Sequence, residues 1–180
     1  MRERLKTRIS KYMSYLLRHD PEDLRMDEHG FVDFNELLQK IREKFPDVNE
    51  SLIVEIVERS ERRRFELRDG RIRALYGHSI PIKLGLKEDP SVKILYHGTT
   101  PEAARKILRE GIKPMRRRWV HLSPTPEMAR RVGLRRTSRP AILEIAVERA
   151  RKDGLKFYRA TDEVYLCNYI PPKYIRLMVN

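Results

Sequence analysis

The sequence is poor in the residues that build metal sites and disulfide bonds. It contains one cysteine, Cys167, so no internal disulfide can form. Its five histidines and that cysteine form no cluster at the spacing of zinc ligands. A structural metal is therefore not expected.

Long apolar runs are also missing. No stretch approaches the ~18 residues that a membrane-spanning helix needs, and residues 1–6 lack the apolar segment of a signal peptide. Neither an internal repeat nor a low-complexity tract is present. Because 40% of the 180 residues are hydrophobic, the chain can bury the core of one large or two small domains. We expect a soluble globular protein of the cytoplasm, without a membrane partner.

Acidic residues are too few to balance the basic ones. The chain has 39 Lys and Arg against 26 Asp and Glu, which gives a net charge of +13. Residues 101–140 hold twelve of the basic side chains against three glutamates, a net +9. Arginine predominates there, as suits bidentate binding of oxyanions, so we expect a polyanionic partner. A charged fraction of 36% also fits a heat-adapted protein.

The first half is predicted to hold three helices and a hairpin. Residues 5–17 place apolar side chains on one helical face, and Asp20-Pro21 ends this helix, because proline disfavours helical backbone at the preceding residue. A brief strand leads into a second helix capped by Asp33, and residues 52–57 carry the apolar face of a third. Asp69-Gly70 then predicts a hairpin turn. This order is the outline of a winged-helix module.

The second half is predicted to be α+β. Residues 81–92 contain prolines and glycine with mixed charge and little periodicity, which is typical of a linker. We therefore divide the chain into residues 1–80, a linker at 81–92, and residues 93–180. The expected strands of the last part lie at 94–96, 120–122, 141–147, 156–158, 164–166 and 175–179, with helices at 101–109 and 126–132.

Four short stretches carry side chains suited to binding anions or to catalysis. They are Arg18-His19, Arg62 to Arg64, His97-Gly98 and Arg116 to Arg118. In the strand that follows the last of these, His121 and Ser123 share one face. Each stretch also has an ordinary structural explanation, such as a basic helix end for Arg18-His19 or a strand-to-helix junction for His97-Gly98. Their spacing alone does not show that they converge.

Taken together, these residues resemble the RNA 2′-phosphotransferases of the Tpt1/KptA family. The resemblance runs in order over nearly the whole chain. Its segments are Ser10-Lys11, Leu16 to Pro21, Gly30 to Val32, Arg64-Phe65, Ile72 to Ala74, Gly77 to Ser79, Leu95 to Thr99, Val120 to Ser123, Pro171-Pro172 and Tyr174-Ile175. The chain departs from the family at Leu75-Tyr76, where members often have Asn-Gln, and at Trp119, where many have histidine.

The resemblance implies an N-terminal winged-helix lobe that binds RNA and a C-terminal lobe with the ADP-ribosyltransferase fold. It also implies removal of an internal RNA 2′-phosphate, such as one at a tRNA splice junction, with NAD⁺ consumed as co-substrate and no metal. An ADP-ribosylated RNA phosphate is the implied intermediate. The products are RNA with a 2′-hydroxyl, nicotinamide and ADP-ribose 1″,2″-cyclic phosphate. We expect a monomer.

The family's functional residues map onto ten positions of this sequence. The resemblance assigns the catalytic residues to Arg18, His19, Arg64 and Arg117. It assigns NAD⁺ binding to His97, Gly98, Thr99, His121, Ser123 and Val164.

Two other functions fit parts of the same pattern. One is an ADP-ribosyltransferase that acts on terminal phosphates of nucleic acids. Transferases that modify proteins usually carry glutamate at the position of Val164, which argues against a protein target, although Glu163 is adjacent. The other is a winged-helix nucleic-acid binder without enzymatic activity, which would not need His97-Gly98-Thr99.

Overall fold

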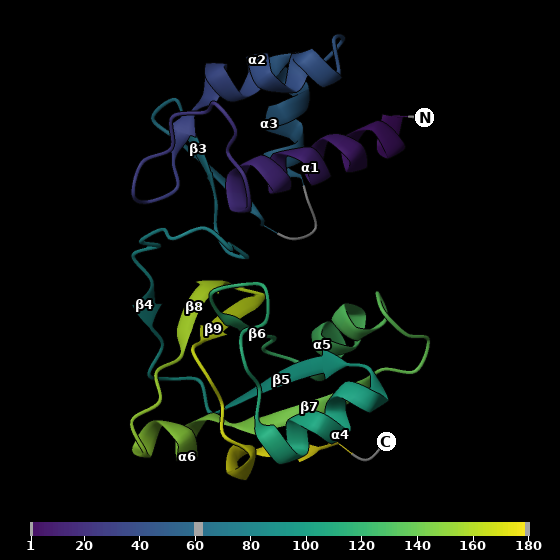
Figure 1. Ribbon diagram of the computed structural model, residues 1–180, viewed down its shortest axis with the longest axis vertical. Coiled ribbons are helices and arrows are strands. Elements are labelled where there is room, and N and C mark those ends of the chain that lie inside the picture. Colours follow the sequence, from purple (N-terminus) through teal and green to yellow (C-terminus); the bar gives the residue numbers. More distant parts are fainter. Residues whose placement is uncertain (1, 60–62, 179–180) are drawn as a thin grey trace. The chain divides into compact units, whose positions relative to one another are not determined.

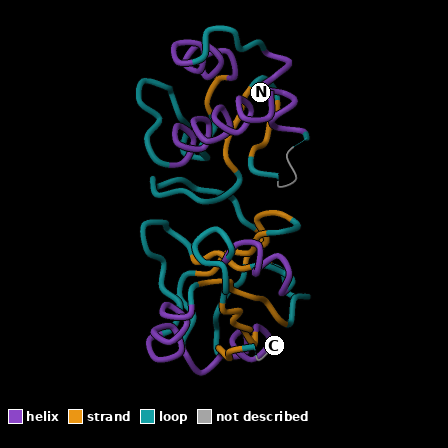
Figure 2. Tube along the Cα trace, turned by 90° about the vertical axis from the view of Figure 1, so that its right-hand side faces the viewer, coloured by secondary structure: helices purple, strands orange, loops and turns teal. Residues whose placement is uncertain are grey.

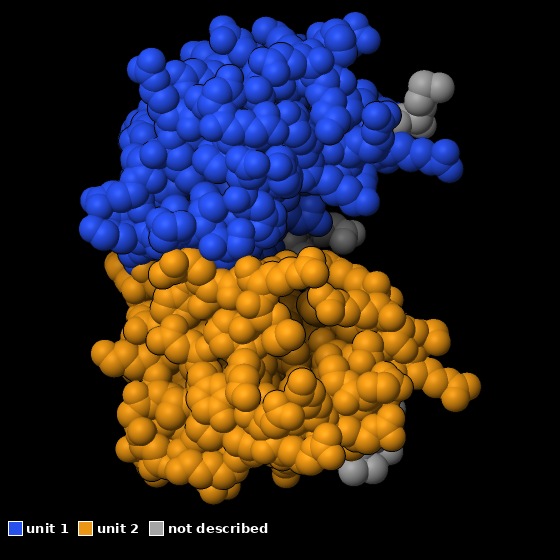
Figure 3. Space-filling model, in the orientation of Figure 1, with its two compact units in different colours: residues 1–85 blue, residues 86–180 orange. Residues whose placement is uncertain are grey.

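The computed structural model describes residues 2–59 and 63–178. Arg62 of the basic run and Val179 of the last predicted strand lie outside the described residues. The chain divides into two compact units, residues 1–85 and 86–180 (Figure 3). The described residues form six α-helices and several small antiparallel sheets. None of these helices has the length and apolar character needed to cross a membrane.

Unit 1 packs three helices against a small sheet (Figure 1). The helices are α1 (Arg2–Arg18), α2 (Phe34–Lys44) and α3 (Glu50–Glu58); the strands are β1 (Val32–Asp33), β2 (Phe65–Arg68) and β3 (Arg71–Ala74), in the order β1-β3-β2. The core comprises side chains from each helix and from the hairpin, namely Ile9, Met13, Leu16, Leu17, Leu37, Ile41, Ile53, Phe65 and Ile72. The three predicted helices and the predicted hairpin are confirmed. Residues 19–31 form a long loop, teal in Figure 2.

Local sequence signals explain where these elements begin and turn. The Asp33 carboxylate accepts hydrogen bonds from the backbone N–H groups of Asn35 (2.8 Å) and Glu36 (3.1 Å), which satisfies two of the four unpaired donors at the start of α2. In the hairpin, Asp69 and Gly70 have φ angles of 52° and 69°. Two left-handed residues match the twist of a two-residue hairpin, which fixes the register of β2 against β3.

The described part of unit 2 contains two antiparallel sheets, three α-helices and a short 3₁₀-helix at Pro172–Tyr174. Its elements are β4 (Lys87–Glu88), β5 (Ile94–Thr99), α4 (Pro101–Glu110), β6 (Val120–Leu122), α5 (Pro126–Gly133), β7 (Ala141–Ala146), α6 (Val147–Lys152), β8 (Tyr158–Thr161), β9 (Val164–Cys167) and β10 (Ile175–Leu177). One sheet has the order β10-β7-β5 and the other the order β4-β8-β9-β6. The backbones of Tyr96 and Ser123 exchange two hydrogen bonds of 2.8 Å, and this bridge joins the two sheets.

Helices α4 and α5 cover opposite faces of the sheet that contains β5 (Figure 1). Ala104 of α4 belongs to the same buried cluster as Leu95 and Leu143. Gly98 instead lies directly against the backbone of α5 at Ala129. Leu95 and Gly98 are three residues apart in one strand, so they face opposite sides.

Several features of unit 2 differ from the predictions, and one of them is β8, which spans Tyr158–Thr161 and not 156–158. Strand β5 pairs with β7 through Thr99, so His97 and Gly98 lie within the strand and not at its end. The predicted strand 141–147 ends at Ala146, because the chain turns into α6 at Val147. Strand β4, which pairs with β8, lies inside the predicted linker. The helix predicted at 126–132 is one residue longer, because Gly133 is the last residue of α5; a Cβ on Gly133 would crowd Pro140.

The segment that enters β5 is held by a partly buried polar network around Asp89. The Asp89 carboxylate accepts hydrogen bonds from the Ser91 hydroxyl (2.6 Å) and the Tyr165 hydroxyl (2.8 Å). Arg151 donates to the carbonyl oxygens of Asp89 (2.8 Å) and Val92 (2.9 Å). The Ser91 and Tyr165 hydrogen bonds lower the pKa of Asp89 to about 2, while burial and the contact with Asp89 raise the pKa of Tyr165 to about 12.

Replacing Asp89 by asparagine should lower the free energy of unfolding by about 1–2 kcal/mol at neutral pH, because hydrogen bonds to a charged acceptor are lost. The folded-state pKa is depressed, so this stabilisation is complete above the unfolded pKa of about 4 and is lost as the pH falls towards 2. Urea denaturation at neutral pH and at about pH 3 measures both effects. Asp162→Asn, at an exposed carboxylate of the same unit, is the control. An Asp89→Asn protein as stable as the control at neutral pH would contradict the role of the network.

Candidate active site

Arg18 is the most constrained of the predicted site residues in unit 1. It is the last residue of α1, and its side chain is only 8% exposed. The guanidinium lies 5.0 Å from the ring centroid of Tyr76 and 5.8 Å from that of Phe65. Both rings are within cation–π range, so their faces stabilise the positive charge while fixing where it points. Tyr76 is one of the two departures from the family noted at 75–76, and the structure gives it this contact.

The loop Gly77 to Ser79 closes over the end of α1. The Ser79 N–H donates to the Arg18 carbonyl oxygen (2.9 Å) and so satisfies an acceptor at the helix C-terminus. Gly77 has a φ of 92°, and a Cβ there would lie 3.4 Å from the Arg18 side chain. A glycine is needed at this position for its backbone conformation, and its small size lets the arginine pass beside it.

His19 is exposed and follows Arg18 directly. Its Nδ1 lies 3.0 Å from the Ser79 hydroxyl oxygen. The Ser79 hydroxyl also donates to the Arg18 carbonyl oxygen (3.4 Å). In the tautomer in which His19 Nδ1–H donates to the Ser79 oxygen, Nε2 of His19 carries no proton.

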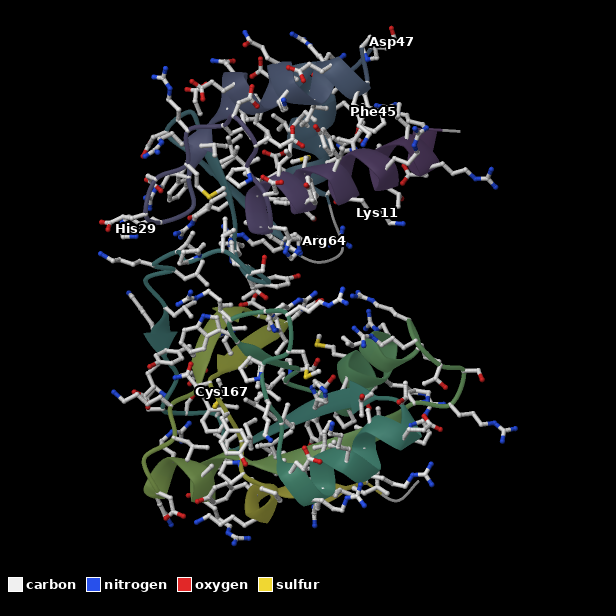
Figure 4. All side chains as sticks on the ribbon, viewed as in Figure 1. Lys11, His29, Phe45, Asp47, Arg64 and Cys167 are labelled. Atoms are coloured by element: carbon white, nitrogen blue, oxygen red, sulfur yellow. The ribbon has the colours of Figure 1, made fainter. Side chains whose placement is uncertain are left out.

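Arg64 belongs to the same part of unit 1. It lies beside α1 (Figure 4), and its Nη1 donates to the hydroxyl of Ser10 on that helix (3.0 Å). Its carbonyl oxygen accepts from the Leu75 N–H (2.9 Å), which extends the hairpin by one pair. The next residue, Phe65, packs its ring against the Arg18 guanidinium, so the same hairpin contacts both Arg18 and, through Arg64, Ser10 of α1.

The predicted NAD⁺-binding residues gather around the junction of the two sheets in unit 2. Nδ1 of His97 in β5 lies 3.1 Å from the carbonyl oxygen of His121 in β6. Burial and the positive charge of Arg136 lower the pKa of His97 below its usual value, against the opposing effect of that hydrogen bond. His97 is therefore a neutral imidazole at pH 7, with Nε2 as an acceptor.

The other predicted residues of unit 2 are placed by the same strands. Ser123 is bridged to Tyr96 of β5, and its side chain is buried. Val164 begins β9, next to Tyr165, which pairs with Leu122 of β6. Thr99 is the last residue of β5. The visible face of unit 2 is hollowed where Figure 1 shows β5 between β6 and α5 (Figure 3).

Two of the predicted site residues, Arg117 and Gly98, differ from the others in their surroundings. Arg117 lies in the exposed segment between α4 and β6. Gly98 has a packing role, because α5 lies directly on it and leaves no room for a side chain. Sequence reasoning missed the contact of Tyr76 with Arg18 and the electrostatic effect of Arg136 on His97, and only the charge of segment 101–140 indicated the second. Within the residues that the structure describes, no group of three or more His, Cys, Asp or Glu side chains could hold a metal ion.

The family model and the similar proteins that match this chain point to the same family. Residues 4–169 match the family model described as RNA 2′-phosphotransferase, Tpt1 / KptA family. A protein of Pyrococcus abyssi named "Probable RNA 2′-phosphotransferase" is 46% identical, over 91% of this chain and 91% of that protein. Proteins with the same name are 43% identical in Thermococcus kodakarensis, over 96% of this chain and 97% of that one, and 38% identical in Bacillus thuringiensis, over 99% of both.

Proposed function

Because this chain belongs to the Tpt1/KptA family of RNA 2′-phosphotransferases, which are transferases, we propose that it removes an internal 2′-phosphate from RNA and consumes NAD⁺ in doing so. The observation that carries the proposal is that Arg18 and His19 lie at the C-terminal end of α1, while Arg64 of the adjoining hairpin is hydrogen-bonded to Ser10 of the same helix. Two arginines and a histidine so placed are suited to a phosphate dianion. A tRNA with a splice-junction 2′-phosphate is the proposed substrate, and the protein acts as a monomer.

The two units have separate duties in this proposal. Unit 1 is a winged-helix lobe that binds the RNA phosphate, which its three helices and β2–β3 hairpin support. Unit 2 is an ADP-ribosyltransferase-like lobe that binds NAD⁺. The neutral His97 supports this assignment, because its Nε2 can accept a hydrogen bond from a ribose hydroxyl without adding charge.

The proposed reaction has two steps. An oxygen of the RNA 2′-phosphate first attacks the anomeric carbon of the nicotinamide ribose; the bond to nicotinamide breaks, and nicotinamide leaves as a neutral base. The adjacent ribose 2″-hydroxyl then gives up its proton and attacks the phosphorus. The bond from phosphorus to the RNA 2′-oxygen breaks, and that oxygen takes up a proton. The products are RNA with a 2′-hydroxyl and ADP-ribose 1″,2″-cyclic phosphate.

Charge explains why arginines are needed. The RNA phosphate must come close to the anionic pyrophosphate, and two unit charges 4 Å apart repel by about 4 kcal/mol at an effective dielectric near 20. Arg18, Arg64 and Arg117 offset this repulsion, as positioned cations do in other phosphoryl transfers. His19 transfers a proton at Nε2 in the second step, since the pKa of a histidine lies near neutrality.

Incubation of the protein with NAD⁺ and an RNA that carries one internal 2′-phosphate tests the function directly. We expect release of nicotinamide and of ADP-ribose 1″,2″-cyclic phosphate, with a 2′-hydroxyl left on the RNA. RNA with only a terminal phosphate is the matched control. Stable ADP-ribosylation of that control, with no reaction at the 2′-phosphate, would contradict the proposal and indicate a transferase for terminal phosphates.

His19→Ala should slow the second step about a hundredfold, the lower end of the usual contribution of a general acid or base. In a single turnover, the ADP-ribosylated RNA then accumulates while nicotinamide is still released. His29→Ala is the control, because His29 is an exposed histidine of the same unit that contacts the Lys83 carbonyl oxygen instead. Decay of the intermediate at the wild-type rate would remove His19 from this role.

A further inference from the structure

The segment from the end of α5 to the start of β7 concentrates positive charge. It contains five arginines between residues 130 and 139 and no acidic residue. Arg130, Arg131, Arg136 and Arg139 are exposed, and we call these four the arginine ridge. The fifth, Arg135, is also exposed. Like charges so close together repel one another, so the protein alone gains nothing from this concentration.

The ridge differs in its partners from several basic side chains of unit 2. Basic groups elsewhere in the unit that lie within 4 Å of a carboxylate include Arg105, Lys113, Arg159, Lys173 and Arg176. Within the described part of the chain, no carboxylate lies within that distance of the four ridge arginines. Heat adaptation works through networks of paired charges, so it does not explain unpaired ones.

Helix geometry does not explain the ridge either. Ala129 and Gly133 form the buried side of α5, so Arg130 and Arg131, which follow Ala129 at about 100° per residue, point away from the sheet. Basic residues in a last helical turn interact favourably with the helix dipole. That effect falls off within the turn, and Arg136 and Arg139 lie beyond the helix end.

The ridge adjoins the predicted NAD⁺-binding strand. A Cβ on Gly133 would lie 3.3 Å from the backbone nitrogen of Thr99, so the helix ends beside the last residue of β5. Arg136 follows within one turn, and its N–H donates to the Gly133 carbonyl oxygen (2.9 Å). Its charge is close enough to His97 to affect that histidine. A polyanion bound along the ridge therefore lies next to the predicted NAD⁺-binding residues of unit 2.

We propose that the arginine ridge binds the phosphate backbone of the RNA outside the nucleotide that carries the 2′-phosphate. This inference rests on the proposed function and deepens it, because it makes the preferred substrate an RNA long enough to cover both the ridge and the site. Arginine suits this role, since its planar fork of donors matches phosphate oxygens and is always charged. Backbone binding is independent of base sequence and weakens with salt.

A pair of charge-matched variants tests the ridge. The ridge variant carries Arg130→Gln, Arg131→Gln and Arg139→Gln, and it leaves out Arg136 because of its closeness to His97. The control carries Arg105→Gln, Lys106→Gln and Arg109→Gln on α4, which removes the same three charges from exposed positions on the opposite face of the sheet. Circular dichroism and melting temperature verify the fold of both.

Two RNAs with the same internal 2′-phosphate are compared. One has a few nucleotides, and the other is longer than the site of about 4–16 nucleotides that a single-strand-binding fold covers. For the ridge variant, kcat/KM on the long RNA should fall about tenfold. The slope of log kcat/KM against log salt concentration, measured between about 50 and 200 mM, should become less negative by about 2, which is about 0.7 for each lost phosphate contact. The ridge variant's kcat/KM on the short RNA and both values of the control should stay within about twofold of wild type.

Equal losses in the two variants, no loss in either, or the same loss on both RNAs would overturn the proposal. Direct binding keeps the test separate from catalysis. The long RNA without a 2′-phosphate, fluorescently labelled and without NAD⁺, should bind the ridge variant about tenfold more weakly than the control. If the wild type turns over neither RNA, the proposed function fails, and this binding measurement alone decides the ridge.

Discussion

Arg64→Ala will lower the turnover of 2′-phosphorylated RNA by about a thousandfold, or about 4 kcal/mol of transition-state stabilisation. The reason is that Arg64 is a positioned cation whose one described side-chain hydrogen bond, to Ser10, holds it beside α1. Only this bond is lost on truncation, so the free energy of unfolding should change by about 1 kcal/mol. Single-turnover kinetics and urea denaturation measure the two quantities. The same loss of turnover is expected for Arg117→Ala.

Arg63→Ala is the matched control for Arg64→Ala. Arg63 is the preceding residue in the chain and is exposed, so its removal should leave turnover within about twofold of wild type. Arg64→Lys keeps the charge but loses the planar fork of donors, and we expect it to recover only part of the activity. Wild-type turnover in Arg64→Ala, or an equal loss in Arg63→Ala, would exclude Arg64 from the phosphate site.

Gly98→Ala will destabilise unit 2 by about 3 kcal/mol or more, the upper range for a buried overpacking substitution. A Cβ at this position would overlap the carbonyl oxygen of Ala129 in α5, and backbone atoms cannot move aside as a flexible side chain can. Thermal melting and hydrogen exchange in β5 report the loss. Gly154→Ala is the control, because Gly154 has open space around it and a φ of 90°, so alanine there costs only about 1 kcal/mol of backbone strain. Equal melting temperatures for the two variants would show that β5 and α5 can separate.

Local signals predicted the elements whose causes are local. The helix beginning after Asp33, the turn at Asp69-Gly70 and the helix end before Asp20-Pro21 each depend on a few neighbouring residues. The length of β5 was not predictable in this way, because its last residues become strand only by pairing with β7. The change from β7 to α6 at Val147 likewise depends on packing and not on the apolar run.

The candidate site was predictable as a set of residue types but not as a set of contacts. The residues Arg18, His19 and Arg64 could be singled out from their sequence context. The stacking of Arg18 on Tyr76 joins residues far apart in the chain, so no spacing indicated it. The ridge was visible only as net charge, since exposure and the absence of acidic neighbours in the described residues are properties of the fold.

The contact between Gly98 and α5 also has a mechanical consequence. Most helices rest on sheets through a layer of side chains, which change rotamer and absorb small displacements. At Gly98 the helix packs against the strand backbone itself, so no side chain lies between them to absorb a displacement. A displacement of α5, such as one caused by a ligand bound to its outer arginines, is therefore transmitted directly to the strand that holds His97.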